Sequence, residues 1–174
     1  MWAQYLSIPE VNNLESERFI KIFGNIVEHC LAAGIGILKN RPFGDVEDVV
    51  KAIFQYLDGL KLSEKEKILQ LYPDSVSKLA GFSNSMLEFN THQKIVNAAP
   101  TNIRFEDKKR LKQLSKNYKE KFGFPFILCS KDENIDNICE TIESRMLNDK
   151  NTEIEVALEE VKKIAKLRIY EIIK

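Results

Sequence analysis

The chain of 174 residues carries 26 lysines plus arginines against 26 aspartates plus glutamates, so its formal net charge is zero. This length suits one domain with a single core, and a balanced charge provides no overall field that would draw the protein to nucleic acid or an anionic membrane. Three cysteines lie far apart without a C-x-x-C pair, which fits neither a disulfide framework nor a zinc site and indicates a reducing compartment.

The first clear elements are two helices. An apolar helix is expected from Ile26 to Leu38; it contains His29, which has no second histidine at metal-ligand spacing and receives no function here. Between Asp45 and Leu60 the apolar residues recur at steps of three and four, as on one side of an amphipathic helix. This second helix is the clearest in the sequence.

A short helix follows, and Ser63 with Glu66 reads as its capping box. It must stop near Pro73, because proline disfavours helical geometry in the residue before it. Tyr72 is therefore expected at a helix end, where its hydroxyl either serves a pocket or belongs to an aromatic ring that simply packs.

Further helices are expected at about 85–98, 104–121 and 134–148, and Thr152 with Glu155 reads as the capping box of a last helix that runs almost to the C-terminus. The stretch 122–128, FGFPFIL, breaks this pattern, and we interpret it as a buried extended segment. No segment alternates with a period of two. The prediction is an all-α fold, with residues 1–174 forming one compact multi-helix domain.

An arginine lies on the apolar side of the last helix. The stripe Ile154, Leu158, Val161, Ala165, position 168 and Ile172 advances by steps of three and four, and position 168 is arginine. Burying an unpaired charge costs several kcal/mol, so Arg168 should meet a carboxylate, a set of carbonyls or an anionic ligand. The alternative is that it reaches the rim or pairs with a structural acid.

Two other side chains could carry chemistry. His92 could act as a general acid or base near neutral pH, although a lone histidine more often lies at the surface or is satisfied in the core. Cys129 could be a nucleophile, but nothing in the sequence pairs it with a base, so buried packing is favoured. No phosphate loop, G-x-S-x-G elbow or H-E-x-x-H motif occurs.

Location signals point to the cytoplasm. The chain begins with MWAQYLSIPE, which lacks a basic start followed by an apolar stretch, and no run reaches the ~18 apolar residues of a membrane span. Its last residues, YEIIK, are not an S-K-L type peroxisomal address. We expect a cytoplasmic protein with no nucleic-acid and no membrane partner.

Taken together and in order, several blocks resemble the OHCU decarboxylase family, which acts on 2-oxo-4-hydroxy-4-carboxy-5-ureidoimidazoline. The resemblance covers nearly the whole chain. Its blocks are Phe23-Gly24-Asn25 with Glu28, Arg41-Pro42-Phe43, Pro73-Asp74, His92-Gln93, YKEKFGFPFI from Tyr118 to Ile127, and EVKKIAKLRI from Glu160 to Ile169.

The resemblance implies an all-helical homodimer that uses no cofactor and no metal to remove carbon dioxide from a small ureidoimidazoline acid, giving (S)-allantoin. In the family, a histidine before the Pro-Asp pair is the catalytic acid, a glutamate before the glutamine assists it, and an arginine of the last helix binds substrate. Those positions are Tyr72, His92 and Arg168 here. Other substrate-contacting positions correspond to Pro73, Phe89, Gln93, Phe126, Ile127, Leu128, Cys129 and Ser130.

These departures leave two hypotheses open. The unperturbed pKa of tyrosine is ~10, against ~6.5 for histidine. Tyr72 is therefore a poor replacement for an acid that must gain and lose a proton near neutral pH. Phe89 also fills space where relatives have a small polar residue. The chain is either a diverged decarboxylase, acting through His92 or on a related acid, or a non-catalytic relative that binds a small molecule or serves a structural role.

Overall fold

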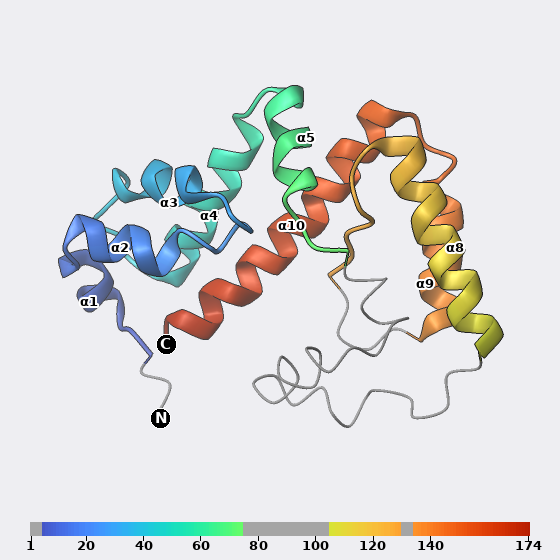
Figure 1. The fold of residues 1–174 in the computed structure, drawn as a ribbon. Coiled ribbons are helices and arrows are strands. Elements are labelled where there is room, and N and C mark those ends of the chain that lie inside the picture. Colours follow the sequence, from blue (N-terminus) through green and yellow to red (C-terminus); the bar gives the residue numbers. More distant parts are fainter. Residues whose placement is uncertain (1–4, 75–104, 130–133) are drawn as a thin grey trace. The chain divides into compact units, whose positions relative to one another are not determined.

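The computed structural model describes residues 5–74, 105–129 and 134–174. The described residues form helices joined by turns, with no β-strand among them beyond one isolated parallel bridge between Leu6 and Ile173. The all-α prediction is therefore confirmed (Figure 1). The chain divides into two compact units, 1–72 with 154–174 and 73–153, and the single-domain assignment of 1–174 stays a prediction.

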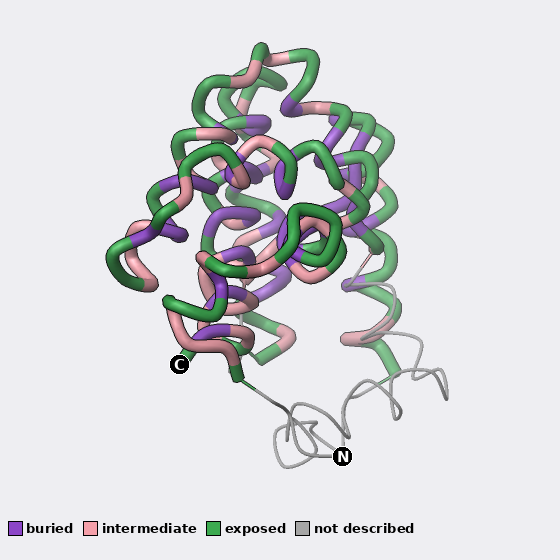
Figure 2. Tube along the Cα trace, turned by 90° about the vertical axis from the view of Figure 1, so that its left-hand side faces the viewer, coloured by how far each residue is buried: buried purple, intermediate pink, exposed green. Residues whose placement is uncertain are grey.

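The first unit gathers the N-terminal helices and most of the C-terminal helix α10 (Lys150–Ile172). Helix α2 packs against α3, and α3 against α4. Their apolar sides form a core in which Phe19, Phe23 and Ile53 have no exposed surface, and Figure 2 marks such buried positions in purple. The N-terminal helices of this unit are α1 (Ile8–Asn13), α2 (Ser16–Phe23), α3 (Leu31–Leu38), α4 (Val46–Asp58) and α5 (Leu62–Gln70).

Side-chain contacts to the backbone brace the start of this unit. The guanidinium of Arg41 donates through Nη1 to the carbonyls of Val11, Asn12 and Leu14 at 3.4, 3.3 and 2.6 Å, which satisfies the end of α1. The amide of Asn12 in turn holds the backbone of Phe43 on both its N–H and its carbonyl. The Arg41-Pro42-Phe43 block of the sequence thus has a structural role.

Both expected capping boxes are placed wrongly. Helix α5 begins at Leu62, and the Glu64 carboxylate accepts from the backbone N–H of Lys61 at 2.8 Å, so Ser63 and Glu66 lie inside the helix. Helix α10 begins at Lys150, and Asp149 accepts from the N–H of Thr152 at 2.9 Å. At α10 the Asp149 carboxylate caps as well as a threonine hydroxyl does and adds a favourable charge at the helix start, whereas at α5 the Glu64 carboxylate accepts the backbone N–H of the residue before the helix.

The second unit contains α8 (Phe105–Phe122), α9 (Ile135–Arg145) and the first turn of α10. Helix α8 packs against α9. These two helices confirm the predictions for 104–121 and 134–148, while the predicted helix at 85–98 lies outside the described residues. The expected break at 122–128 begins one residue later, because Phe122 still belongs to α8. The non-helical segment that follows is largely buried, with Phe124 and Phe126 fully inaccessible and Ile127 nearly so.

Candidate functional site

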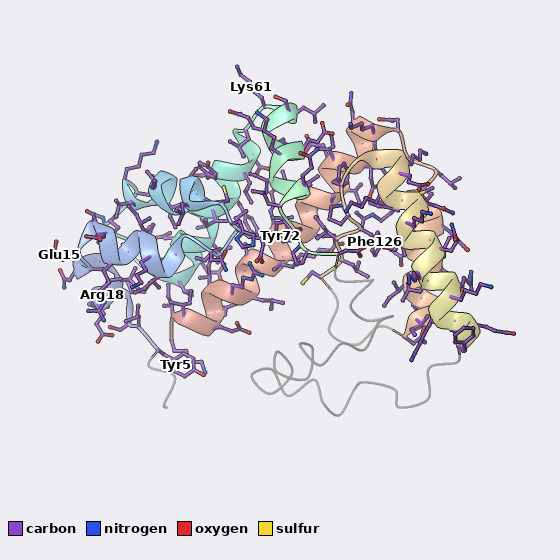
Figure 3. The ribbon with its side chains drawn as sticks, in the orientation of Figure 1. Tyr5, Glu15, Arg18, Lys61, Tyr72 and Phe126 are labelled. Carbon is purple, nitrogen blue, oxygen red and sulfur yellow. The ribbon has the colours of Figure 1, made fainter. Side chains whose placement is uncertain are left out.

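Tyr72 lies directly after α5, at the helix end that the following proline predicts. Its side chain is buried, with 7% of the residue exposed, and Figure 3 labels it at this point. The phenol oxygen accepts a hydrogen bond from the backbone N–H of Glu28 at 3.3 Å. That bond uses the oxygen as an acceptor and leaves the phenol proton available to donate.

Arg168 meets the groups that its place on the apolar stripe predicted. Its Nη2 donates to Oε2 of Glu28 at 2.6 Å, and its Nη1 donates to the carbonyls of Asn25 and Ile26 at 3.0 and 3.3 Å. The side chain remains 30% exposed. A carboxylate and carbonyls together thus satisfy this charge, and the guanidinium still reaches solvent.

The turn that supplies these partners runs from Gly24 to Cys30 and is not helical. The expected helix from Ile26 is therefore wrong in its first turn, because α3 begins only at Leu31. At the start of the turn, α2 approaches α3 so closely that a Cβ on Gly34 would lie 3.1 Å from Cα of Gly24. An apolar composition cannot reveal such a break, since buried turns and buried helices look alike by periodicity.

His29 has an unusual backbone within this turn. Its φ is 51°, in the left-handed region that only a few per cent of non-glycine residues adopt, with asparagine, aspartate and histidine the most frequent among them. Its N–H donates to Oδ1 of Asn25 at 3.0 Å, which holds the turn closed. Its imidazole Nε2 lies 3.6 Å from Oε1 of Glu28, while 70% of the side chain is exposed.

The electrostatics of this cluster, formed by Glu28, His29, Tyr72 and Arg168, set its chemical capacity. Burial is the main cause that raises the pKa of Tyr72 to about 12, and the nearby Glu28 carboxylate also raises it, while the Glu28 N–H and the Arg168 charge act against this rise. Tyr72 is therefore a neutral hydrogen-bond donor at physiological pH. The cluster can bind an oxyacid or a ureido group through the guanidinium and the phenol, but the phenol is a poor source of protons.

The other described candidates belong to the second unit. Phe126 and Ile127 are buried, Leu128 and Cys129 are partly exposed, and Pro73 is exposed. Phe126 packs edge-on against Tyr118, at 5.3 Å between ring centroids, and the Arg145 guanidinium lies 4.6 Å from the Phe126 ring centroid.

A buried ionic network that sequence reasoning missed supports this segment. Arg145 donates through Nε to Oε1 of Glu153 at 2.6 Å and through Nη1 to the carbonyl of Ile127 at 2.7 Å. The Tyr118 hydroxyl donates to the same Glu153 oxygen, and burial raises the pKa of Tyr118. A signal existed, because Ile138, Ile142 and position 145 form a three-and-four stripe with arginine on its apolar side, as in the last helix.

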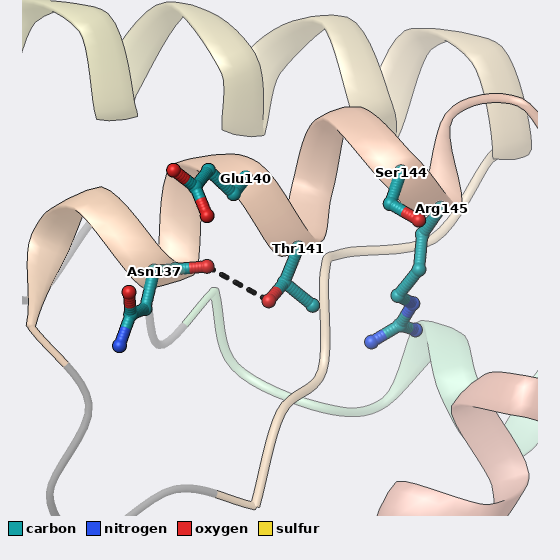
Figure 4. A pocket seen from close by; sticks show the side chains of 5 residues that line it. All are labelled: Asn137, Glu140, Thr141, Ser144 and Arg145. Carbon is teal, nitrogen blue, oxygen red and sulfur yellow. Dashed lines mark hydrogen bonds between the residues drawn. The ribbon is translucent and has the colours of Figure 1, made fainter.

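A separate open depression of about 420 Å³ lies along α9, lined by Asn137, Glu140, Thr141, Ser144 and Arg145 (Figure 4). Within it, the Thr141 hydroxyl donates to the carbonyl of Asn137 at 2.8 Å, an ordinary bond inside one helix. The lining includes none of the residues that the resemblance marks. The depression is therefore not the candidate site.

Four sequence candidates, Phe89, His92, Gln93 and Ser130, lie outside the described residues. Of the described candidates, the structure joins Tyr72 and Arg168 through Glu28 within the first unit. Within the described part of the chain, no three or more histidine, cysteine, aspartate or glutamate side chains are placed to hold a metal ion. Over the same residues, no helix is long and apolar enough to cross a membrane.

Comparison with known proteins decides the family. The sequence profile of the family described as OHCU decarboxylase matches residues 12–170, nearly the whole chain. This chain belongs to the OHCU decarboxylase family. Of the cluster, Tyr72 and Arg168 are the positions that the resemblance marks for the catalytic acid and for substrate binding, and these roles stay predictions.

Relatives of known name match this chain in sequence over nearly their whole length. The 2-oxo-4-hydroxy-4-carboxy-5-ureidoimidazoline decarboxylase of Amia calva is 33% identical over 97% of this chain and 95% of its own. The protein of the same name from Xenopus laevis is 32% identical over 94% of this chain and 93% of its own. The uric acid degradation bifunctional protein of a Bacillus strain is 26% identical over 96% of this chain, which matches 32% of that longer protein, and its name links the family to urate degradation.

Solved structures support the family fold. A crystal structure of (S)-allantoin synthase superposes with a TM-score of 0.77 at 19% identity, covering 97% of this chain, which spans about half (54%) of that longer one. An OHCU decarboxylase crystallised in the presence of (S)-allantoin superposes with a TM-score of 0.63 at 20% identity, covering 90% of this chain and 96% of its own.

Proposed function

We propose that this chain binds 2-oxo-4-hydroxy-4-carboxy-5-ureidoimidazoline and decarboxylates it to (S)-allantoin without a cofactor. The observation that carries the proposal is the Arg168 guanidinium, held by Glu28 and two backbone carbonyls beside the Tyr72 phenol and still partly open to solvent. A fixed, planar cation next to a neutral donor suits a small acid that also carries ureido carbonyls.

The reaction makes few demands on a protein. The bond from the ring carbon to the carboxylate breaks, carbon dioxide leaves, and the electron pair passes into the imidazolone ring. A proton must then reach that carbon from one side, which sets the stereochemistry. Arg168 and Tyr72 would orient the ring and its ureido group, a contribution that comes from positioning rather than from covalent chemistry.

A second function, binding without turnover, is favoured by one observation. The pKa of Tyr72 stands at about 12, so the residue at the family's acid position does not release a proton near neutral pH. A protein with this cluster alone would hold the ligand in place and leave its decay to solvent.

One assay separates the two functions. Urate oxidase and hydroxyisourate hydrolase generate the substrate in place, this protein is added, and circular dichroism follows the optical activity of the allantoin. The proposal expects a dichroic signal that grows with protein concentration above the spontaneous background. A trace that matches the control without protein removes the decarboxylase proposal, and calorimetric binding of (S)-allantoin would then support the binding function.

We propose that two copies associate, as the family resemblance implies, with no nucleic acid as partner. Sedimentation equilibrium over a tenfold range of protein concentration tests this, and a mass equal to one chain of 20.1 kDa throughout would refute it.

A further inference from the structure

At the position that the family resemblance marks for the acid, burial raises the pKa of Tyr72 to about 12, so its phenol is a poor proton source near neutral pH, and His29 has the chemistry to supply the proton instead. An imidazolium is the side chain that most readily gives up a proton near neutral pH. His29 is the one histidine among the described residues, the other being His92. Its side chain is 70% exposed, so a ligand and solvent protons can both reach it.

The backbone at His29 is held in an uncommon conformation. A φ of 51° lies in the left-handed region, which few non-glycine residues adopt although histidine does so more often than most, and such positions persist where surrounding contacts hold them. Two side chains do so here. Asn25 accepts the N–H of His29 at 3.0 Å, and the Tyr72 phenol accepts the N–H of the preceding Glu28 at 3.3 Å.

Glu28 connects the imidazole to the binding groups. Its Oε1 lies 3.6 Å from Nε2 of His29, and its Oε2 accepts from Arg168 at 2.6 Å. One carboxylate, with a side chain only 15% exposed, thus lies between the imidazole and the guanidinium. A carboxylate in this place orients the imidazole, as the partner acid does in other acid–base pairs.

We propose that His29, oriented by Glu28, is the catalytic acid that delivers the proton to the substrate carbon in this chain. This inference rests on the proposed function. It assigns the acid role to a residue of the 24–30 turn, where the family places it on the residue before the Pro-Asp pair.

Decarboxylation and proton transfer occur in sequence at the same ring carbon. The substrate carboxylate departs as carbon dioxide and leaves its bonding electron pair on the ring. The imidazolium N–H bond breaks, its proton forms the new C–H bond, and the imidazole becomes neutral. Water then reprotonates the exposed ring, so each turnover consumes one solvent proton and requires no oxidant or reductant.

The pH dependence of the rate follows from the groups that surround the imidazole. Glu28 and Cys30 come from the same turn, Tyr72 from the end of α5, and Arg168 from α10. The pKa of Tyr72 is about 12 and a guanidinium stays charged, so neither changes charge near neutral pH. A step that consumes the imidazolium proton slows as pH rises, so the wild-type rate should fall with rising pH and the residual rate of His29→Gly should not.

The test uses variants that suit a left-handed backbone. Glycine adopts a positive φ freely and asparagine does so more readily than most residues, so His29→Gly and His29→Asn should both fold. In the coupled assay both are expected to lose about 100-fold or more in kcat, the range that a positioned acid provides. Added imidazole should restore His29→Gly in proportion to its concentration but leave His29→Asn low, because the asparagine side chain fills the site.

Controls distinguish this inference from the proposed function. Cys30→Ser should keep the neutral pH dependence, and far-ultraviolet dichroism checks that each variant is folded. If folded His29→Gly turns over at the wild-type rate, or His92→Asn removes the pH dependence instead, the acid is not His29 although the decarboxylase stands. Unrescued loss in His29→Gly likewise refutes it, and a silent wild type refutes the proposed function together with this inference.

Discussion

The contact between Arg168 and Glu28 should stabilise the fold as well as form the site. Arg168→Met keeps the aliphatic stem but removes donors to two carbonyls and to the Glu28 carboxylate. Hydrogen bonds to charged groups contribute about 1.5–3 kcal/mol. Because the arginine side chain is 30% exposed, we expect Arg168→Met to lose unfolding free energy in the lower part of this range, about 2 kcal/mol. Glu28→Gln should cost about 1 kcal/mol, because the amide oxygen still accepts one bond.

A double-mutant cycle in urea unfolding isolates the coupling between the two charges. A pair of this exposure lies between surface pairs and buried ones, and we expect a coupling of about 1 kcal/mol. Lys163→Met on the same helix is the matched control, since its side chain is 60% exposed, and it should change stability by less than about 0.5 kcal/mol. A coupling indistinguishable from zero would mean that Glu28 does not hold the Arg168 guanidinium, which would contradict the proposed arrangement of the site.

Three further outcomes are expected. Glu153→Gln should lower unfolding free energy by about 3–5 kcal/mol, because it leaves a buried Arg145 without its counter-charge, and a loss below about 1 kcal/mol in urea unfolding would refute the buried network. The raised pKa of Tyr72 favours its neutral form in the fold, so its contribution is complete below the unfolded value near ~10 and is lost as pH rises towards about 12. Between about pH 9 and about pH 11.5 the unfolding free energy should thus fall more in the wild type than in Tyr72→Phe. Parallel curves of unfolding free energy against pH for the two proteins would contradict this. Tyr72→His with His92→Glu should raise stereospecific allantoin formation in the coupled dichroism assay, and a folded but unimproved double variant would indicate that the cavity itself differs.

The helical fold follows from local patterns that tertiary packing leaves intact. The apolar spacing from Val46 to Asp58 survives as α4, and the proline after Tyr72 ends its helix as expected. Helix starts were less predictable, because Ser63 and Thr152 fit the capping-box pattern although α5 begins after Lys61 and Asp149 caps α10. Which residue caps depends on where the chain turns, and that is decided by contacts distant in sequence.

In the candidate site, too, local patterns predicted some features and contacts distant in sequence decided the others. A charge on an apolar stripe predicted that Arg168 must find partners, and the identical argument would have found Arg145. The left-handed turn at His29 had little signal, because an apolar run hides a break between helices, and histidine, although enriched at positive φ, adopts other conformations far more often. The sequence marked the neighbouring Glu28 only as part of a block that resembles the family, and it predicted no role for this residue.

Optical activity in the coupled reaction tests the central claim most directly, with wild type and Arg168→Met compared at equal concentration. The account predicts that wild type accelerates the appearance of optically active allantoin and that the folded variant loses at least about tenfold of that acceleration, which corresponds to one charge-assisted contact of about 1.4 kcal/mol. Equal acceleration by both proteins would show that Arg168 does not bind the substrate. Acceleration by neither would show that this member of the family does not decarboxylate it.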